Sequence, residues 1–412
     1  MLSPYRVLDL CSGGSAICGQ ALGDLGADVI LVEPPGGNNS RRAGPFLGGQ
    51  PHSDRSLSFW AVNRNKRSVT VDIRQAAGRD VFGRLVAGAD FILESFAPGY
   101  LTSLGLGYEA LAAVNPRTIL VSMTPFGQTG PKAGWAASDL TIMAASGVLS
   151  QQGDDDRAPV RLSMPQAMFH AGAEAGCGAL IAHFARLKDG IGQHVEVSAQ
   201  EAAMIATQSM VLNSGWGEDL ITRTSGGLKL GPINLRFVQP SKDGHVSVTF
   251  LFGTAIGPFT RRLMEVMHAE GFVDDATRDK DWVSYATLVI TGQEPLSELA
   301  RCLGCIREWT LSHTKDELFE MALTRGLLIV PVSTTEDVVH SKQLAERDFW
   351  RDLFHAELSR TVRYPGPFAK FSKTPIQFGR RPPLTGEHTA EVLGEAGYSP
   401  GQLAELTAQG VI

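Results

Sequence analysis

A glycine turn between a strand-like and a helical segment is the first feature that could bind a ligand. The stretch VLDLCSGGSAICGQALGDLGADVILVEPPGG, from Val7, predicts a strand, a turn, a small-residue helix and a strand ending at Glu33. Amides in such a turn can face a phosphate or carboxylate. The spacing Gly13, Gly14, Gly19 is not GxGxxG, so a dinucleotide site has weak support. S-adenosylmethionine methyltransferases begin similarly, and a tight turn without ligand also fits.

A cluster of cations is the second such feature. Arg64, Lys66, Arg67 and Arg74 fall within eleven residues around the strand-like sequence VTV. Several fixed cations beside one strand suit a polyanionic ligand such as a nucleotide diphosphate. The alternative is a solvated run of charge without a ligand.

The cysteines predict neither a disulfide framework nor a metal site. The five in the chain form an odd and sparse set, which argues against a secreted disulfide framework. Cys302 and Cys305 form a single CxxC with no second pair at zinc spacing, so we expect a coincidence of helical spacing and no metal site.

Composition narrows the class of protein. The 412 residues carry a net charge of -6, with 43% hydrophobic and 19% charged residues, which is typical of a soluble globular protein. This charge disfavours non-specific nucleic-acid binding. No uncharged apolar run reaches the length of about 18 residues that spans a bilayer, and the first residues do not resemble a signal peptide. We therefore expect a cytoplasmic protein without membrane association.

The elements that must position these residues follow an α/β pattern. Short apolar runs alternate with helical patterns in the first 130 residues, which predicts a parallel sheet with crossover helices. The predicted strands are Arg6 to Leu10, Asp28 to Glu33, Asp90 to Glu94, Thr118 to Ser122 and His194 to Val197. The predicted helices of this part lie near Ser15 to Leu25, Gln75 to Ala87, Pro165 to Leu187 and Gln200 to Leu212. Glycines 172, 176 and 178 suggest that another backbone approaches the third of these helices.

Changes in composition predict the domain organisation. Residues 1–213 form the first part of a large domain, and the Gly-, Ser-, Asn- and Thr-rich residues 214–240 are interpreted as a linker. Residues 241–326, an alternating strand followed by amphipathic helices, form a smaller α/β domain. Residues 327–412 return to the large domain and complete it.

The order of several blocks resembles one known family. These blocks are VLDL…LGADVILVEPPGG, NRNKRSVTVDI, GADFILESFAPGYLTSLGLGYEAL, NPRTILVSMTPFGQTGP, ASGVLS, LKDGIGQHVEVSAQEA, IVPVSTTEDV and GEHTAEVLGEAGYS. Together they resemble the class III CoA-transferases, which include α-methylacyl-CoA racemases and carnitine-type acyltransferases, over nearly the whole chain. The resemblance makes a methyltransferase a remote alternative.

The resemblance implies a fold and a ligand. It implies a large Rossmann-like domain built from both chain ends, a smaller middle domain and two subunits interlocked as rings. The substrate would be coenzyme A or an acyl-CoA thioester, bound on the large domain without a metal. The residues that the resemblance places along the CoA are Gly14, Ser15, Ala16, Val71, Arg74 and Phe96, with Arg41 or Arg42 as a second phosphate contact.

The catalytic position of the family is altered. Family members carry a nucleophilic aspartate in a stretch resembling PxADxxAG, which forms a mixed anhydride and then an aspartyl-CoA thioester. The matching stretch is PQAMFHAG from Pro165, with Met168 in the place of the aspartate. A thioether has no ionisable group, so the family's transfer cannot proceed through this position. His170 and Glu174 are weak substitutes, because on a helix neither occupies the same direction as residue 168.

Other departures concern the same region. The GHD stretch of the racemases is replaced by Ala137-Ser138-Asp139, which makes racemisation improbable. The usual asparagine of ENF is Ser95, and a basic residue often found after the PG turn is Ser103. Both changes predict weaker or altered CoA binding.

Three hypotheses follow. The first is a subunit without catalytic residues in a heteromeric class III CoA-transferase, interlocked with an Asp-bearing paralogue as a heterodimer or heterotetramer. The second is an acyl-CoA lyase, isomerase or hydratase that uses no covalent aspartate, with Glu174, His170 or Asp139 as base. The third is a non-enzymatic CoA-binding assembly protein.

Overall fold

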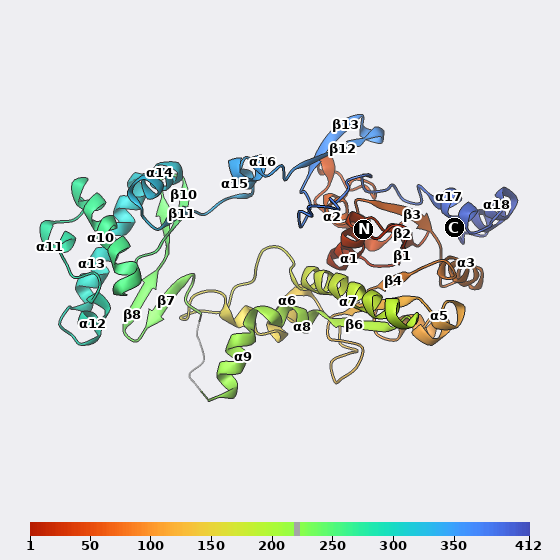
Figure 1. The fold of residues 1–412 in the computed structure, drawn as a ribbon, viewed down its shortest axis with the longest axis horizontal. Coiled ribbons are helices and arrows are strands. Elements are labelled where there is room, and N and C mark those ends of the chain that lie inside the picture. The colour runs from red at the N-terminus through yellow and green to blue at the C-terminus, as the bar shows by residue number, and fades with distance from the viewer. Residues whose placement is uncertain (218–222) are drawn as a thin grey trace. The chain divides into compact units, whose positions relative to one another are not determined.

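The chain folds into two compact units (Figure 1). The computed structural model describes residues 1–217 and 223–412. The first unit comprises Met1–Leu149, Arg161–Asp219 and Leu344–Ile412, and the second comprises Ser150–Val160 and Leu220–Gln343. Both ends of the chain therefore belong to the first unit.

A six-stranded parallel sheet forms the centre of the first unit. Its strands are β1 (Arg6–Asp9), β2 (Asp28–Glu33), β3 (Lys66–Thr70), β4 (Phe91–Glu94), β5 (Ile119–Thr124) and β6 (His194–Ser198). They lie in the order β3-β2-β1-β4-β5-β6, so the direction of winding reverses between β1 and β4. Ligands of open α/β sheets bind outside the carboxyl ends of the strands at such a reversal.

Helices cover both faces of this sheet. The helices of the first unit are α1 (Ile17–Asp24), α2 (Leu57–Ala61), α3 (Ala76–Val86), α4 (Tyr100–Ser103), α5 (Tyr108–Val114), α6 (Asp139–Ala145), α7 (Ala167–Asp189), α8 (Ala199–Met204), α9 (Gln208–Gly215), α17 (Thr389–Glu395) and α18 (Pro400–Ala408). Apolar side chains of α3, α5 and α17 pack on one face, and those of α1 and α7 pack on the other. The near-continuous apolar strands require this double cover.

The C-terminal segment is fixed to the edge of the sheet by ion pairs. Arg67 in β3 contacts Glu391 at 2.8 Å and Glu395 at 2.7 Å, and α17 packs beside β3. A separate hairpin of β12 (Arg351–His355) and β13 (Arg360–Tyr364) precedes this segment. Residues from the last tenth of the chain thus complete the domain that the first residues begin.

The second unit has its own apolar core. Its strands are β7 (Gly227–Leu230), β8 (Ile233–Arg236), β9 (Val238–Ser241), β10 (Gly244–Val248) and β11 (Ile329–Pro331). Its helices are α10 (Gly253–Ala269), α11 (Asp275–Arg278), α12 (Tyr285–Ile290), α13 (Leu296–Ser312), α14 (Lys315–Arg325) and α15 (Thr335–Val339), and α16 (Lys342–Glu346) spans the boundary in the sequence. The core is rich in aromatic residues, including Trp282 and Trp309.

Two predicted boundaries need correction. Most of the predicted linker 214–240 is structured, because β7 and β8 form a hairpin and Ile233 and Leu235 are buried; residues 218–222 lie outside the described residues. The predicted return at residue 327 is also too early. β11 pairs antiparallel with β10, so this strand belongs to the second unit, which extends to Gln343.

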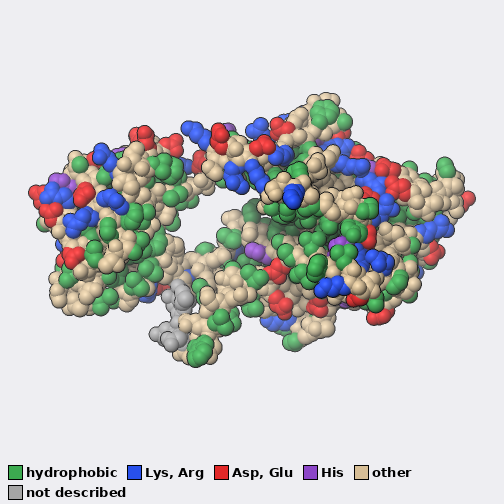
Figure 2. Space-filling view, in the orientation of Figure 1, with side chains coloured by type: hydrophobic (Ala, Val, Ile, Leu, Met, Phe, Trp, Pro, Cys, Tyr) green, Lys and Arg blue, Asp and Glu red, His purple; other side chains and the backbone are tan. Residues whose placement is uncertain are grey.

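The surface shows no dominant charge on the face drawn in Figure 2, where basic and acidic side chains are interspersed. Among the described residues, no helix is both long enough and apolar enough to cross a bilayer.

Candidate functional site

A cavity of about 470 Å³ opens at the point where the strand order reverses. Segments that follow β1, β2, β3 and β4 all contribute to it. The lining residues include Leu10, Ser12, Glu33, Asn38, Arg42, Val71, Asp72, Arg74, Ser95, Phe96 and Tyr100. The cavity therefore lies where open α/β sheets bind their ligands. Its volume is large enough for a cofactor-sized molecule.

Three of the residues predicted to contact CoA line this cavity. Val71 and Arg74 come from the segment after β3, and Phe96 follows β4, with its ring 4.9 Å from that of Tyr100. Arg74 is largely exposed and binds Asp72, with 2.8 Å between Nε and Oδ1. This pairing lowers the pKa of Asp72 to about 2. The guanidinium is thus held at the rim, where an incoming phosphate can meet it.

Of the two adjacent arginines, only Arg42 lines the cavity. Arg41 is fully buried, with 2.6 Å between its Nη2 and Oε1 of Glu33, and it also binds Asp54. Its guanidinium lies 3.9 Å above the ring of Phe59. The side chain of Arg41 is therefore bound by internal partners, and Arg42 is the one of the two that lines the cavity.

The cation cluster is also largely internal. Lys66 binds Asp9 at 2.7 Å with both side chains fully buried, and Arg64 binds Asp24 at 2.5 Å. Arg67 binds carboxylates at the edge of the sheet, as described above. Of the four cations only Arg74 lines the cavity, and the other three bind carboxylates of the first unit.

The glycine turn lies behind the cavity and does not line it. Residues Gly13–Ala16 form a 3₁₀ turn in which Ser15 and Ala16 are buried. The Ser15 hydroxyl donates to the carbonyl of Ser12 at 2.8 Å, and the Ser12 amide donates to Ser95 Oγ at 3.2 Å. Ser15 thus holds Ser12, which does line the cavity, whereas Gly14 and Ala16 do not line it. Ser95 still makes a polar contact there, although it replaces the usual asparagine.

Close backbone packing joins this turn to the start of α7. A methyl group on Gly14 would lie 3.0 Å from the Phe169 nitrogen and 3.1 Å from the Met168 carbonyl carbon. A methyl group on Gly172 would lie 2.6 Å from Ile17 and 3.1 Å from the Gly14 oxygen. The predicted approach of another backbone is therefore confirmed at Gly172. The close approach of Gly14 to Met168 places residue 168 directly against the turn that follows β1.

Met168 lies in the first turn of α7 and is half-buried. It packs against two apolar clusters, one under the sheet and one between α6, α7 and α8. Asp139 caps this helix, because its Oδ1 accepts from the amides of Gln166 at 2.6 Å and Ala167 at 2.8 Å. Sequence reasoning proposed Asp139 as a base and missed the cap, which joins segments 27 residues apart.

The two proposed substitutes for the missing carboxylate lie farther along α7. His170 is exposed and Glu174 is half-buried. The described residues contain no cluster of three or more His, Cys, Asp or Glu that could hold a metal. Cys302 and Cys305 are unpaired thiols one turn apart in α13. Burial raises the pKa of Cys302 to about 12, which disfavours the reactive thiolate.

Comparison with known proteins decides the family. The family model described as "CoA-transferase family III" matches residues 2–389. This chain belongs to that family. A subunit of succinyl-CoA:(R)-benzylsuccinate CoA-transferase from Thauera aromatica is 36% identical, over all of this chain and 98% of the relative. Succinyl-CoA–D-citramalate CoA-transferase from Chloroflexus aurantiacus is 30% identical, again over all of this chain and 98% of the relative.

Solved structures of the family share the fold. A CaiB/BaiF family protein from Brucella suis superimposes with a TM-score of 0.82 at 26% identity. The alignment covers 95% of this chain and 98% of that protein. The mixed α/β fold with its parallel sheet is therefore shared with this CaiB/BaiF family protein.

Proposed function

We propose that this chain is a subunit of a heteromeric class III CoA-transferase and lacks the catalytic nucleophile of the family. The observation that carries the proposal is Met168, in the first turn of α7 and against the turn after β1. A carboxylate at this place could attack a thioester and carry the acyl group, whereas a thioether cannot. The reaction then requires a paralogous subunit that supplies an aspartate.

The cavity at the end of β1 supports CoA binding by this subunit. Arg42 and Arg74 are cations on its wall, and Phe96 offers an aromatic surface. The cations would bind the phosphates of a CoA thioester, and Val71 and Phe96 would contact its adenosine or pantetheine part. Ser15 would act indirectly, by holding Ser12, and Gly14 and Ala16 belong to the same turn.

The name of one relative supports the heteromeric assembly. The Thauera aromatica protein is one subunit of succinyl-CoA:(R)-benzylsuccinate CoA-transferase. Succinyl-CoA and a dicarboxylic acid such as (R)-benzylsuccinate are therefore the first donor and acceptor to test. A paralogous partner, interlocked with this chain as a heterodimer or heterotetramer, is the assembly that we propose.

Coexpression tests the proposal. The chain alone should transfer no CoA from succinyl-CoA to (R)-benzylsuccinate, whereas the chain purified with an Asp-bearing paralogue should do so. Met168→Ala in this chain should leave the activity of the complex within about twofold, because a thioether supplies neither a nucleophile nor an acyl carrier whose loss could slow the reaction. Strong activity of the chain alone would refute the proposal. Turnover of an acyl-CoA by the lone chain without a second acid would instead favour lyase, isomerase or hydratase chemistry.

A further inference from the structure

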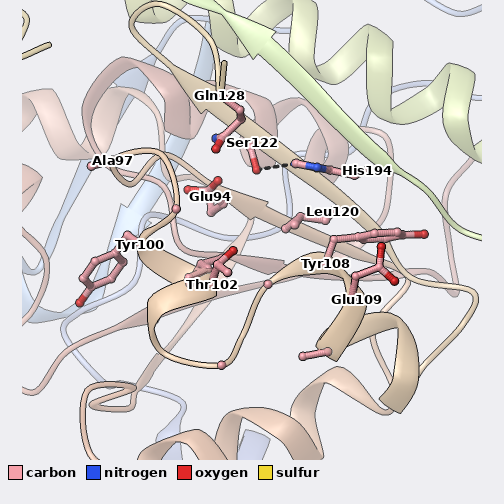
Figure 3. Close-up of a pocket in the computed structure, with 15 residues that line it drawn as sticks. Glu94, Ala97, Tyr100, Thr102, Tyr108, Glu109, Leu120, Ser122, Gln128 and His194 are labelled. Atoms are coloured by element: carbon pink, nitrogen blue, oxygen red, sulfur yellow. Dashed lines mark hydrogen bonds between the residues drawn. The ribbon is translucent and has the colours of Figure 1, made fainter. Parts of the chain in front are cut away.

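A second cavity of about 380 Å³ lies in the first unit over β4, β5 and β6 (Figure 3). It shares only Tyr100 with the cavity at the end of β1. Its lining includes Glu94, Tyr100, Tyr108, Glu109, Ser122 and His194. Nothing in the proposed CoA-transfer chemistry uses this cavity.

A buried carboxylate forms part of its wall. Glu94, at the end of β4, is only 5% exposed, and its Oε2 accepts from the Phe96 amide at 2.7 Å. Ser122 is a hydrogen-bond partner of the same carboxylate, and its Oγ forms a second hydrogen bond with Nε2 of His194, 2.9 Å away. Figure 3 shows these three side chains side by side on neighbouring strands. Burial raises the pKa of Glu94.

This carboxylate has no counter-charge. No cation contributes to its pKa, and none of the described residues that line the cavity is Lys or Arg. Burial lowers the pKa of His194, which favours the neutral ring. The remaining charged group is the carboxylate of Glu109. A buried charge without a partner is unfavourable, so a ligand that brings a positive charge would relieve that cost.

Aromatic groups complete the wall. Tyr108 stacks on the ring of His194, with 5.9 Å between centroids and 17° between planes, and Tyr100 borders the cavity from α4. The faces of aromatic rings attract cations, most strongly where water is excluded. Carboxylates and aromatic rings together, without Lys or Arg, disfavour phosphates and carboxylic acids.

We propose that this cavity binds a small alkylammonium compound. Glu94 would be the counter-charge of the ligand, and Tyr108 would pack against its alkyl groups. The site differs from the cavity at the end of β1, whose lining includes Arg42 and Arg74 beside the acidic residues Glu33 and Asp72. The proposal does not depend on CoA transfer.

Calorimetry with the full chain tests this directly. The probe is choline, and its control is 3,3-dimethylbutan-1-ol, which has the same shape with carbon in place of the charged nitrogen. We expect choline to bind about tenfold or more tightly than the alcohol, from the charge alone. Equal binding of the two probes, or no binding of choline, would overturn the proposal.

Variants identify the residues. Glu94→Gln keeps an acceptor for the Phe96 amide and should weaken choline binding about tenfold or more. Thr102→Lys, at an exposed position, places an ammonium at the cavity and should abolish binding. Glu405→Gln is the matched control and should change affinity less than about threefold, because Glu405 is an exposed residue of α18 that does not line the cavity. Full choline affinity in either of the first two variants, with folding verified by circular dichroism, contradicts the proposal.

Discussion

Neighbouring side chains of the same type can differ in role: one lines a cavity and the other stabilises the fold. Arg41 and Arg42 are adjacent, yet one is buried against Glu33 and the other lines the cavity at the end of β1. Likewise, the ammonium group of Lys66 binds the carboxylate of Asp9, which lies 57 residues earlier in the chain. A basic residue beside a ligand site is therefore no evidence of binding until its internal partners are known.

The adjacent arginines give a paired prediction. Arg42→Gln should weaken CoA binding about tenfold, the effect of one charge-assisted phosphate contact, and leave stability nearly unchanged. Arg41→Gln should lower the free energy of unfolding by about 3–5 kcal/mol, because it leaves Glu33 buried without its partner. Calorimetry with CoA and urea denaturation measure the two effects. An Arg41→Gln protein of normal stability would contradict this assignment.

Glu94 gives a prediction about pH. Its pKa is raised in the folded chain, chiefly by burial, so folding favours the protonated form. Its contribution to stability is complete below the unfolded pKa of about 4.5 and is lost as the pH rises through the folded pKa. Glu94→Gln should therefore be more stable than the natural chain at pH 7, and this gain should shrink toward pH 4. Urea denaturation at both pH values measures it; a gain that grows on acidification would have the wrong sign.

At the scale of elements, the start of α7 depends on its contact with the turn after β1. Gly172→Ala should destabilise the chain by about 1–3 kcal/mol, because the added methyl group would meet Ile17 and two carbonyl oxygens. Gly176→Ala, one turn later, meets nothing within 4 Å and should stabilise by about 0.5–1 kcal/mol. Thermal unfolding compares the two. Equal effects would show that backbone packing does not hold α7 in place.

Some of the strands and helices could be predicted from the sequence, and others could not. Five strands of the sheet were predicted because β2, β4 and β5 are nearly continuous apolar runs, and helix α7 was predicted from its small residues. β3 was seen only as strand-like within a charge run, because the partners of its cations lie up to 328 residues away. The hairpins β7–β8 and β12–β13 were missed, since their polar composition resembles that of a loop. Local patterns could not reveal these long-range pairs.

The candidate site was predictable only in part. The matched motifs identified Val71, Arg74 and Phe96, all of which line the cavity. They did not separate Arg41 from Arg42, and they could not show that Ser12, and not the turn Gly13–Ala16 after it, lines the cavity. No sequence motif predicts the second cavity, because Glu94, Ser122 and His194 come from three strands that meet only in the folded sheet.

At the scale of the whole molecule, one surface of α7 suggests where a partner binds. Ile181, Phe184 and Leu187 are 60–70% exposed, at helical spacing, while the opposite side of α7 packs small residues on the sheet. Hydrophobic side chains reach the surface in this region of Figure 2. Exposed apolar surfaces of this kind are typical of interfaces between subunits.

This surface gives a prediction about assembly. Phe184→Glu should abolish copurification with the Asp-bearing paralogue, because a charge would be buried in the interface. Val114→Glu changes a half-exposed apolar residue of α5 and should leave copurification intact. Size-exclusion chromatography with light scattering separates the cases. A Phe184→Glu chain that still forms the full complex would place the interface elsewhere.

The most direct measurement is covalent trapping on this chain. The purified complex is incubated with isotopically labelled succinyl-CoA, quenched, and each subunit is weighed by intact-mass spectrometry. We predict an acyl or CoA adduct on the paralogous partner and none on this chain, because Met168 offers no carboxylate to acylate. A labelled adduct on this chain, whether at His170, at Glu174 or elsewhere, would contradict the account.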